Sequence, residues 1–573
     1  MGVSSFWFLF FTIALNREHI QALNFTVQCW NPIEITLTAT GNYSTPYIDV
    51  DDLNATFVSS TGVSMTMIGF WDGGLTWKIR FAPLSIGIWT YKTNAKDTGL
   101  NGQTGFITCT PYTGPLPIYQ HGFIKPSANN RYLTYADGTP FYYLGDTHWS
   151  GFSRAERFNE SNDPRFSSMF KGMIDRRVEQ GYTAWKAETF ANNYQESNPS
   201  NEGGPAWIND KFFIDLNPGF WQNIDQRIEY LASKGMVISI AQGIGRSMKN
   251  ASVEPDHRRL ARYILARYGA YPTIWITAQE FDDVRTGNCI QCWADVAAEV
   301  YNLDPYKRAN SLHNAYTNPI VYHDQVWYGF VTLQQGHNYQ APIDYWLGQY
   351  NAIPPRPILE DEANYEDLIP HYTGGVVIPK WKTRQSAWQA QIGGAFGFTY
   401  GGQGIWWACY TTDDPNSNCG NGSSARAWYT AIDFPVGEQM SLMARFWTSF
   451  DWWTLAPDGN AISWSSAPTD HQKPYQKTDG ENRSLVIAYL PLRINGTVYN
   501  GTARNLSPTG IYNAQWFNPR NGTYTMIAQG WMPTQEGLWN VPTQPTADDD
   551  WVLKIQRVNG TNTSPTIPYS DTT

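Results

Sequence analysis

Eight short apolar runs, each ending in polar residues, constrain the fold of this chain more than any other feature. They lie within residues 116–457, and helical patterns separate them. A strand that is apolar along its length and turns polar at its end is typical of a buried parallel sheet. Eight such strands alternating with helices predict a (β/α)₈ TIM barrel of the α/β class. The predicted strands are 141–144, 182–186, 236–241, 272–280, 310–312, 327–333, 357–359 and 395–398, and the predicted helices are 221–234, 256–268, 291–302, 340–350 and 380–392.

Two of the predicted strands run into carboxylates. One ends at Glu280, and the other leads into Glu360, Asp361 and Glu362. The carboxyl ends of TIM-barrel strands form the mouth where catalytic residues lie, and two carboxylates there are what glycosidic bond cleavage requires. Residues two apart on a strand share a face, so Glu360 and Glu362 both remain candidates, with Glu360 deeper as a buried structural charge. The same alternation predicts that Asp361 points outward.

Further polar and aromatic residues follow the predicted strand ends. We predict that they bind or stack on sugar, the alternative being bracing of loops or packing of the core. These candidates are Asp146, His148, Trp149, Lys186, Gln242, Gln279, His313, His337, Tyr400 and Trp406. Glu366 is expected to be a supporting partner or a helix cap. The histidines show neither an H-E-x-x-H motif nor a close pair, so we predict no metal and no cofactor.

All-β patterns flank the predicted barrel. Residues 23–115 and 458–557 alternate apolar and polar positions between turn residues, which predicts one β-sandwich on each side. The remaining polar residues, 558–573, are expected to form a tail. The linker from Pro111 to Pro126 contains four prolines and is therefore expected to be stiff. We predict that the N-terminal sandwich packs on the barrel.

Several features predict secretion. The apolar run Phe6–Leu15 is too short to span a bilayer and fits the core of a signal peptide over residues 1–22. The chain has thirteen N-glycosylation sequons, which favours a secreted, extracellular glycoprotein. Its net charge of −10 argues against nucleic acid or an anionic membrane surface as a partner.

The six cysteines predict three disulfide bonds. Cys29–Cys109 would join the ends of the N-terminal sandwich, and Cys409–Cys419 would close a loop after the last barrel strand. Cys289 and Cys292 form a C-x-x-C, for which a local disulfide is favoured over a redox or zinc site because no second ligand pair accompanies it.

Phe70-Trp-Asp-Gly-Gly-Leu-Thr-Trp-Lys-Ile-Arg-Phe81 is similar to the small N-terminal domain of unknown function that precedes apiosidase-like hydrolases. Leu144-Gly-Asp-Thr-His-Trp149, Ile274-Trp-Ile-Thr-Ala-Gln-Glu280, Glu362-Ala-Asn-Tyr-Glu366 and Gly397-Phe-Thr-Tyr-Gly-Gly-Gln-Gly-Ile-Trp406 resemble the barrel itself. The C-terminal segment resembles a sandwich that often carries a collagen-binding label.

The resemblance implies a general acid at Glu280 and a nucleophile at Glu362. Glu280 stands where apiosidases look to have Asp, which argues against apiose as the substrate. Gln279 replaces the Asn usual in retaining barrel glycosidases, and Ala363 replaces a Pro of the family motif. We therefore predict a secreted, retaining glycoside hydrolase acting on a plant or fungal cell-wall polysaccharide. An inactive carbohydrate-binding or cell-wall protein on the same barrel is the alternative, and the sequence assigns no oligomeric state.

Overall fold

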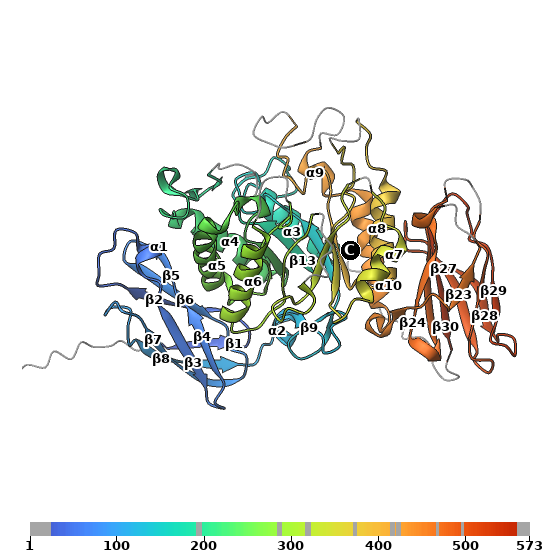
Figure 1. The fold of residues 1–573 in the computed structure, drawn as a ribbon, viewed down its shortest axis with the longest axis horizontal. Helices are drawn as coiled ribbons and strands as arrows, with labels where there is room; N and C mark the ends of the chain where they lie inside the picture. Colours follow the sequence, from blue (N-terminus) through green and yellow to red (C-terminus); the bar gives the residue numbers. More distant parts are fainter. Residues whose placement is uncertain are drawn as a thin grey trace, which may run out of the picture.

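The computed structural model describes residues 24–190, 198–283, 289–315, 322–337, 339–370, 375–412, 419, 426–465, 469–493 and 498–558. Three parts lie in a row, with the N-terminal sandwich at one end, the barrel in the middle and the C-terminal sandwich at the other end (Figure 1). The predicted signal peptide and nearly all of the predicted tail lie outside the described residues. None of the helices in the described segments is long and apolar enough to cross a membrane.

The central sheet has eight parallel strands and confirms the predicted barrel. Its order is β18-β17-β16-β13-β12-β21-β20-β19, which is the order of a barrel opened between its fifth and sixth strands. A parallel bridge between His313 and Thr332 connects the two edges at that point. The strands are β12 (Tyr143–Thr147), β13 (Ala184–Glu188), β16 (Val237–Ala241), β17 (Thr273–Ile276), β18 (Asn310–Ser311), β19 (Val331–Gln334), β20 (Ile358–Glu362) and β21 (Gly397–Tyr400).

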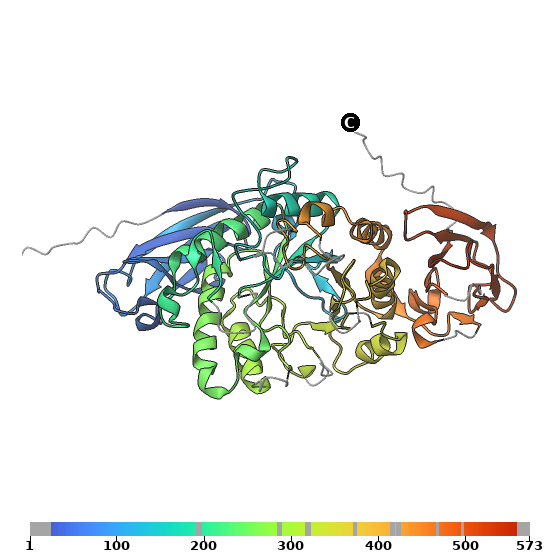
Figure 2. The ribbon, with the colours of Figure 1, turned by 90° about the horizontal axis from the view of Figure 1, so that it is seen from above.

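Helices surround this sheet, as the view from above shows (Figure 2). They are α3 (Met169–Glu179), α4 (Pro218–Ser233), α5 (Glu254–Tyr268), α6 (Ile290–Leu303), α7 (Ile343–Tyr350), α8 (Lys380–Gly393), α9 (Trp428–Ala431) and α10 (Pro435–Thr448). Helix α3 is absent from the sequence prediction. It is capped by Ser168, whose hydroxyl accepts from the Lys171 amide, and it buries Arg177 among apolar residues, which obscures its amphipathic pattern.

The N-terminal sandwich packs a five-stranded sheet on a three-stranded one. The first has the order β1-β8-β7-β3-β4 and the second has the order β2-β6-β5. In β2 buried positions alternate with exposed or half-buried ones, as expected for a half-buried strand. The elements are β1 (Phe25–Gln28), β2 (Ile33–Thr38), α1 (Pro46–Asp49), β3 (Asn54–Ser59), β4 (Ser64–Ile68), β5 (Phe70–Gly73), β6 (Thr76–Phe81), β7 (Gly87–Asn94) and β8 (Thr104–Thr110).

The C-terminal sandwich packs a six-stranded sheet, β22-β24-β25-β30-β27-β28, on a three-stranded one, β23-β26-β29. Strand β22 pairs with β24, so residues 456–457 belong to this sandwich by their hydrogen bonds. The strands are β22 (Ala456–Pro457), β23 (Ile462–Trp464), β24 (Tyr475–Thr478), β25 (Leu485–Leu490), β26 (Gly501–Ala503), β27 (Tyr512–Phe517), β28 (Tyr524–Trp531), β29 (Trp539–Val541) and β30 (Trp551–Arg557).

Short elements complete the connections. A small sheet in the order β11-β10-β9 precedes the first barrel strand, and β14 pairs with β15 in the connection that follows β13. They are α2 (Pro117–His121), β9 (Lys125–Pro126), β10 (Leu133–Thr134), β11 (Pro140–Phe141), β14 (Ser200–Asn201), β15 (Gly204–Pro205), η1 (Ile208–Asp210), η2 (Gly245–Ser247), η3 (Ala251–Val253), η7 (Trp452–Thr454), η8 (Asp470–Gln472) and η9 (Gly480–Asn482).

Buried ion pairs join the N-terminal sandwich to the barrel. Arg80 on β6 donates to both carboxylate oxygens of Asp225 on α4, at 3.1 and 2.7 Å. Arg267 on α5 donates to the same carboxylate and to Asp72 on β5, at 2.7 Å. The hydroxyl of Tyr306 adds a hydrogen bond to the Ala82 carbonyl. The sandwich therefore packs on the helical layer, as predicted.

A second buried junction joins the barrel to the C-terminal sandwich. Arg384 on α8 donates to both carboxylate oxygens of Asp550, and the shortest contact is 2.6 Å. Tyr489 on β25 donates to the same carboxylate, and its ring stacks on Trp388 with the centroids 5.8 Å apart. Each sandwich is thus joined to the barrel by a buried ion pair between an arginine of one part and an aspartate of the other.

Two of the three predicted disulfides are formed. Cys289–Cys292 and Cys409–Cys419 have Cα–Cα distances of 5.3 and 4.7 Å. Cys29 and Cys109 are free thiols with their sulfurs 2.6 Å apart, so the predicted bond between them is not present in this structure. The pairing of Val27 with Cys109, where β1 meets β8, brings the two cysteines together at the edge of the sandwich.

Candidate active site

Asp361 lies inside the barrel, which corrects the prediction that it points outward. Its Oδ2 forms an ion pair with Lys186 of β13, and Thr399 donates to its Oδ1 at 2.8 Å. Strands β12 and β21 separate β13 from β20 in the sheet, so the pair with Lys186 must cross the barrel interior. Burial raises the pKa of Asp361, and Lys186 and Thr399 oppose that rise.

Glu360 belongs to the opposite face of β20. Side chains alternate along a strand, and Glu360 interacts electrostatically with Tyr345 of α7 in the outer helical layer. Its carboxyl accepts from the Gln335 amide at 2.8 Å. Burial raises the pKa of Glu360 well above its ordinary value, which favours the protonated carboxyl. A buried acid that faces outward from the barrel cannot reach an anomeric carbon at the mouth, so it cannot serve as the nucleophile there.

Glu362 lies at the mouth between two histidines. Its Oε2 is 3.7 Å from His313 Nε2, and its Oε1 is 3.5 Å from His337 Nε2. The same His313 nitrogen is 3.7 Å from Asp361, so two consecutive carboxylates face one imidazole. Consecutive side chains of a regular strand point to opposite faces, so this arrangement is irregular. A register shift between Leu333 and Gln334, in the pairing of β19 with β20, accompanies it. Burial lowers the pKa of His313 well below its ordinary value, and nearby Lys186 lowers it further, so this imidazole is neutral.

Glu280 is held at the mouth by hydrogen bonds of its neighbours. The Gln279 carbonyl accepts from the Gly245 amide at 2.6 Å, and the Phe281 amide donates to the His313 carbonyl at 3.1 Å. Glu280 itself has a φ of 44°, a left-handed conformation that side chains seldom adopt. Such strain persists where the surroundings fix the backbone, and it is common at active sites.

One amide side chain links the two predicted catalytic residues. Gln334 Nε2 donates to Glu280 Oε1 at 3.4 Å. In the pairing of β19 with β20, the register partner of Gln334 is Glu362. His313 gives a second link, because its carbonyl bonds the residue after Glu280 and its imidazole faces Glu362. Glu280 and Glu362 therefore share Gln334 and His313 as neighbours.

Aromatic rings line the same region. Lys186 Nζ lies 4.4 Å from the centroid of the Trp149 ring, and this ring lies 6.3 Å from His313. Tyr365 packs between His337 and Trp406, with centroids 4.5 and 5.5 Å away. Trp406 is half-buried. It can offer a ring face to a sugar, whereas Lys186, His313 and Trp149 are buried beneath the surface of the mouth.

Asp146 and His148 form a buried brace. His148 bonds Glu156 through Nδ1 at 2.9 Å and Asp146 through Nε2 at 3.0 Å, and Arg177 of α3 donates to Asp146 at 2.5 Å. Burial alone would lower the pKa of His148, but Glu156 and Asp146 raise it to about 9. Asp146 and His148 are 0% exposed, so neither contacts sugar in this arrangement. This corrects the predicted sugar contacts.

Gln242 and Tyr400 also point away from the mouth, against the prediction. Gln242 donates to the His257 carbonyl of α5 at 2.8 Å. Tyr400 donates to Glu366 at 2.7 Å, and Glu366 accepts from the Val436 amide at the start of α10 at 3.0 Å. Glu366 is therefore a helix cap, one of the two roles expected for it.

Gln279 keeps both amide atoms buried without a hydrogen-bond partner in the described part of the chain. A buried amide of this kind costs free energy unless a polar group meets it. Both atoms are closed to solvent, so Gln279 reaches no sugar in this arrangement, and its predicted contact stays a prediction.

Comparison with known proteins identifies the family. The apiosidase-like catalytic domain family matches residues 127–454, more than half of the 573 residues. This chain belongs to the apiosidase-like family. A domain of unknown function, DUF5060, matches residues 26–96 in the N-terminal sandwich. No curated protein matches the chain.

Solved structures share the fold of this apiosidase-like protein. A Bacteroides vulgatus protein provisionally described as a glycoside hydrolase is 18% identical, covers 93% of this chain and 100% of its own, and has a TM-score of 0.69. A family 5 glycoside hydrolase of Bacteroides vulgatus is 19% identical over 77% of this chain and 94% of its own, with a TM-score of 0.64. A further glycoside hydrolase has a TM-score of 0.62 at 19% identity and covers 78% of this chain and 98% of its own. These similarities show the fold of a TIM-barrel glycoside hydrolase with flanking β domains.

Sequence analysis missed three residues of the mouth. Gln334 lies at the end of β19 and reaches Glu280, Thr399 supports Asp361, and Tyr365 packs on His337. Gln334 and Thr399 carried the same signal as the predicted residues, a polar side chain at a strand end. Tyr365 stood inside the motif that begins at Glu362 and offered no signal beyond its proximity.

Proposed function

We propose that this apiosidase-like protein is a retaining glycoside hydrolase in which Glu362 is the nucleophile and Glu280 the general acid and base. One observation carries the proposal. Gln334 hydrogen-bonds Glu280 and is the register partner of Glu362, so one residue connects two carboxylates that come from different barrel strands, which supports a paired role for them. Retaining hydrolysis needs two carboxyl groups about 5–5.5 Å apart on either side of the scissile bond.

The surroundings of Glu362 suit a nucleophile. His313 faces it as a neutral imidazole, because burial and nearby Lys186 lower its pKa, and the positive charge of Lys186 is itself paired with Asp361. The Glu362 carboxylate therefore keeps electron density for attack on the anomeric carbon. The attack forms a glycosyl ester on Glu362 as the bond to the leaving oxygen breaks.

Glu280 would supply the proton in that step. Its proton passes to the leaving oxygen, and the resulting carboxylate then removes a proton from the water that hydrolyses the ester. The change of Glu362 from an anion to a neutral ester lowers the proton affinity of nearby Glu280, which suits its change from acid to base. Gln334 Nε2 is placed to hold the Glu280 carboxyl through both steps.

The substrate we propose is a plant or fungal cell-wall polysaccharide met outside the cell. Support comes from the apolar N-terminal run, the thirteen sequons and the two disulfides, which are typical of secreted proteins. The half-buried Trp406 suits stacking on a sugar ring. Glu280 in place of the apiosidase Asp argues for a sugar other than apiose.

A panel of wall polysaccharides tests the proposal. The purified protein is expected to release reducing sugar from at least one of them, and Glu280→Gln is expected to release far less. Product anomers followed by NMR in the first minutes should have the configuration of the substrate. Initial release of the opposite anomer would contradict the retaining mechanism. Binding to a polysaccharide without any release would favour an inactive carbohydrate-binding protein.

A further inference from the structure

A second cavity lies at the end of the barrel opposite the mouth, where the C-terminal sandwich joins it. Its volume is about 160 Å³. Residues 394–396 line it just before β21 begins, and the amino ends of parallel strands form the edge opposite their carboxyl ends. Residues 452–456 of the segment leading into the C-terminal sandwich form another wall. This cavity is separate from the candidate active site.

Two cations of different elements line this cavity. Arg131, which follows β9, lies with its guanidinium carbon 4.0 Å from the centroid of the Tyr350 ring and donates to the Tyr350 carbonyl. This arrangement fixes the plane of the guanidinium and leaves further N–H donors for another acceptor. Lys477 of β24 lines the cavity from the sandwich side and is 5% exposed.

Lys477 stands in a buried row on the face of the sheet that packs against the barrel. Its register partner is Ile487 of β25, and the next partner in the row is Lys554 of β30. Ile487 belongs to the core that the sandwich shares with the barrel. The Lys477 ammonium lies 5.6 Å from the Trp447 ring, and Lys554 lies 5.2 Å from Phe450. Burial lowers the pKa of Lys477 to about 7.

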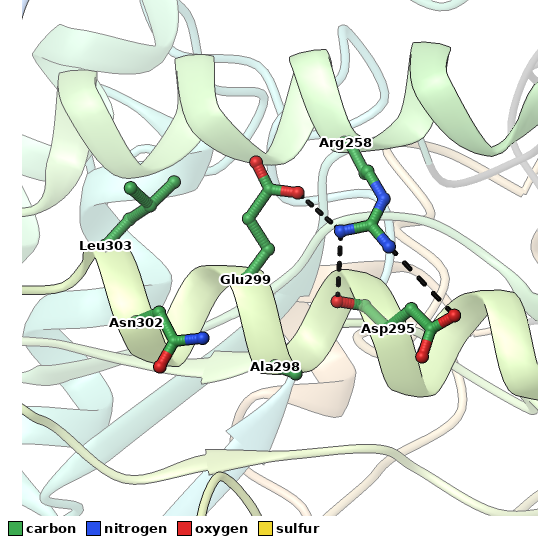
Figure 3. A pocket seen from close by; sticks show the side chains of 6 residues that line it. All are labelled: Arg258, Asp295, Ala298, Glu299, Asn302 and Leu303. Carbon is green, nitrogen blue, oxygen red and sulfur yellow. Dashed lines mark hydrogen bonds and ion pairs between the residues drawn. The ribbon is translucent and has the colours of Figure 1, made fainter.

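The charge of the cavity wall is unbalanced. Among the described residues that line it, Arg131 and Lys477 are cationic and none carries a carboxylate. The cavity between α5 and α6 shown in Figure 3, of about 360 Å³, is a useful contrast. There Arg258 contacts Glu299 and Glu254 at 2.6 Å each, so its charge is already met. A cation left in a buried wall without such a partner costs free energy unless an anion joins it.

We propose that the cavity lined by Arg131 and Lys477 binds the carboxylate of an acid no larger than one sugar ring, such as a uronic acid. The planar guanidinium suits a carboxylate, and the ammonium supplies a second charged donor. Asn129 and Thr454 on the rim offer polar groups to ring hydroxyls, and Trp453 offers an aromatic face. The volume of about 160 Å³ admits a ligand of monosaccharide size.

Titration calorimetry with three probes tests the chemistry of the ligand. Glucuronate is expected to bind, glucose is expected not to bind although its ring is the same size, and inorganic phosphate is expected to bind more weakly than glucuronate. Equal binding of glucose would overturn the proposal because charge would then contribute nothing. Tighter binding of phosphate than of glucuronate would contradict a carboxylate as the ligand. If glucuronate did not bind, the cavity would not be a binding site for such acids.

Lys477→Met and Lys473→Met form a matched pair of variants. Lys473 is half exposed and pairs with Asp344 at 3.6 Å, away from the cavity wall. Lys477→Met is expected to weaken glucuronate binding by at least about tenfold. The same change should keep or raise the midpoint of thermal unfolding, because it replaces a buried amine with an apolar chain of similar length. Loss of binding only together with unfolding, or equal loss in Lys473→Met, would contradict the assignment.

Proton uptake gives an independent readout. If a carboxylate binds beside Lys477, it raises the proton affinity of that amine, so at about pH 8 binding should take up as much as about one proton. Calorimetry in two buffers of different ionisation enthalpy measures this number. The uptake should disappear in Lys477→Met. Binding of glucuronate without proton uptake in the unchanged protein would show that Lys477 does not meet the ligand.

Discussion

The barrel mouth and the two sandwich junctions bury the same kinds of charged residue but pair them differently. At the N-terminal junction, the Asp225 carboxylate accepts four hydrogen bonds, two from Arg80 and two from Arg267, from four guanidinium nitrogens at 2.6–3.1 Å. Burial would raise the pKa of Asp225, but the two arginines hold it below its ordinary value. At the mouth, the ion-pair partners of Glu362 in the described part of the chain are two imidazoles at 3.5 and 3.7 Å.

This difference separates structural from chemical roles. A carboxylate held by two guanidinium groups cannot change its state without leaving a buried charge unpaired, so it fixes one arrangement of domains. A carboxylate beside a neutral imidazole can become an ester at little electrostatic cost. Completeness of pairing, and not burial or residue type alone, thus distinguishes Asp225 from Glu362.

The substitution Glu362→Gln is expected to have the largest effect, a loss of catalytic rate. Loss of the nucleophile should reduce kcat by about 10⁴-fold or more with little change in folding. Initial rates on the best polysaccharide of the panel measure it. Glu360→Gln is the matched control, because Glu360 is buried and faces outward, and burial raises its pKa. Its rate should stay within about threefold of the unchanged protein. A larger loss in Glu360→Gln than in Glu362→Gln would reverse the assignment.

Glu280→Gln should have the next largest effect. Removal of the general acid is expected to reduce the rate on a polysaccharide by about 10²–10⁴-fold. An aryl glycoside whose leaving group is a weak base needs little protonation, so the first step on such a substrate should lose much less. Pre-steady-state measurement of phenol release isolates the rate of the first step from that of ester hydrolysis. An equal loss on both substrates would show that Glu280 does not donate the proton.

Asp225→Asn tests the other side of the comparison. It leaves Arg80 and Arg267 buried without their shared anion, so we expect a loss of about 3–5 kcal/mol in the stability of the junction. Chemical denaturation with tryptophan fluorescence, supported by proteolysis between residues 112 and 128, measures the effect. Asp215→Asn is the control, since Asp215 pairs with Lys211 at the surface and should lose no more than about 1 kcal/mol. Similar small losses in both variants would show that complete pairing does not secure the junction.

The smallest expected effect concerns pH and His148. Its pKa is about 9 in the folded protein and about 6.5 when unfolded, so the folded protein binds the extra proton more tightly. Its contribution to stability is complete below about pH 6.5 and is lost as the pH rises through about 9. The thermal midpoint should therefore fall more over this window in the unchanged protein than in His148→Gln. If the thermal midpoints of the two proteins fell equally with pH, His148 would contribute no pH-dependent stability.

The positions of the barrel strands were predictable from sequence because each strand changes from apolar to polar where it leaves the core. Strand β20 shows the limit of that approach. Simple alternation predicted Glu360 and Glu362 on one face and Asp361 on the other. The register shift against β19 instead turns Asp361 and Glu362 toward the same His313. A bulge depends on the partner strand, so one strand's pattern cannot reveal it.

The direction of polar side chains at the mouth was equally hard to predict. Asp146, His148, Gln242 and Tyr400 end strands as catalytic residues do, yet each bonds a buried partner. Two of these partners, Arg177 on α3 and the His257 carbonyl on α5, follow 31 and 15 residues later, on helices of the outer layer. Sequence position places a residue at the mouth, but such tertiary contacts decide which way it faces.

Covalent labelling of the nucleophile tests the central claim most directly. A 2-deoxy-2-fluoro glycosyl fluoride of the sugar that the panel shows to be cleaved should form a stable ester, because the fluorine slows its hydrolysis. Intact-mass spectrometry should show one added sugar per protein, and peptide fragmentation should place it on Glu362. A label on Glu360 or Asp361 would contradict the account. So would an unlabelled protein that turns over the same sugar with inversion.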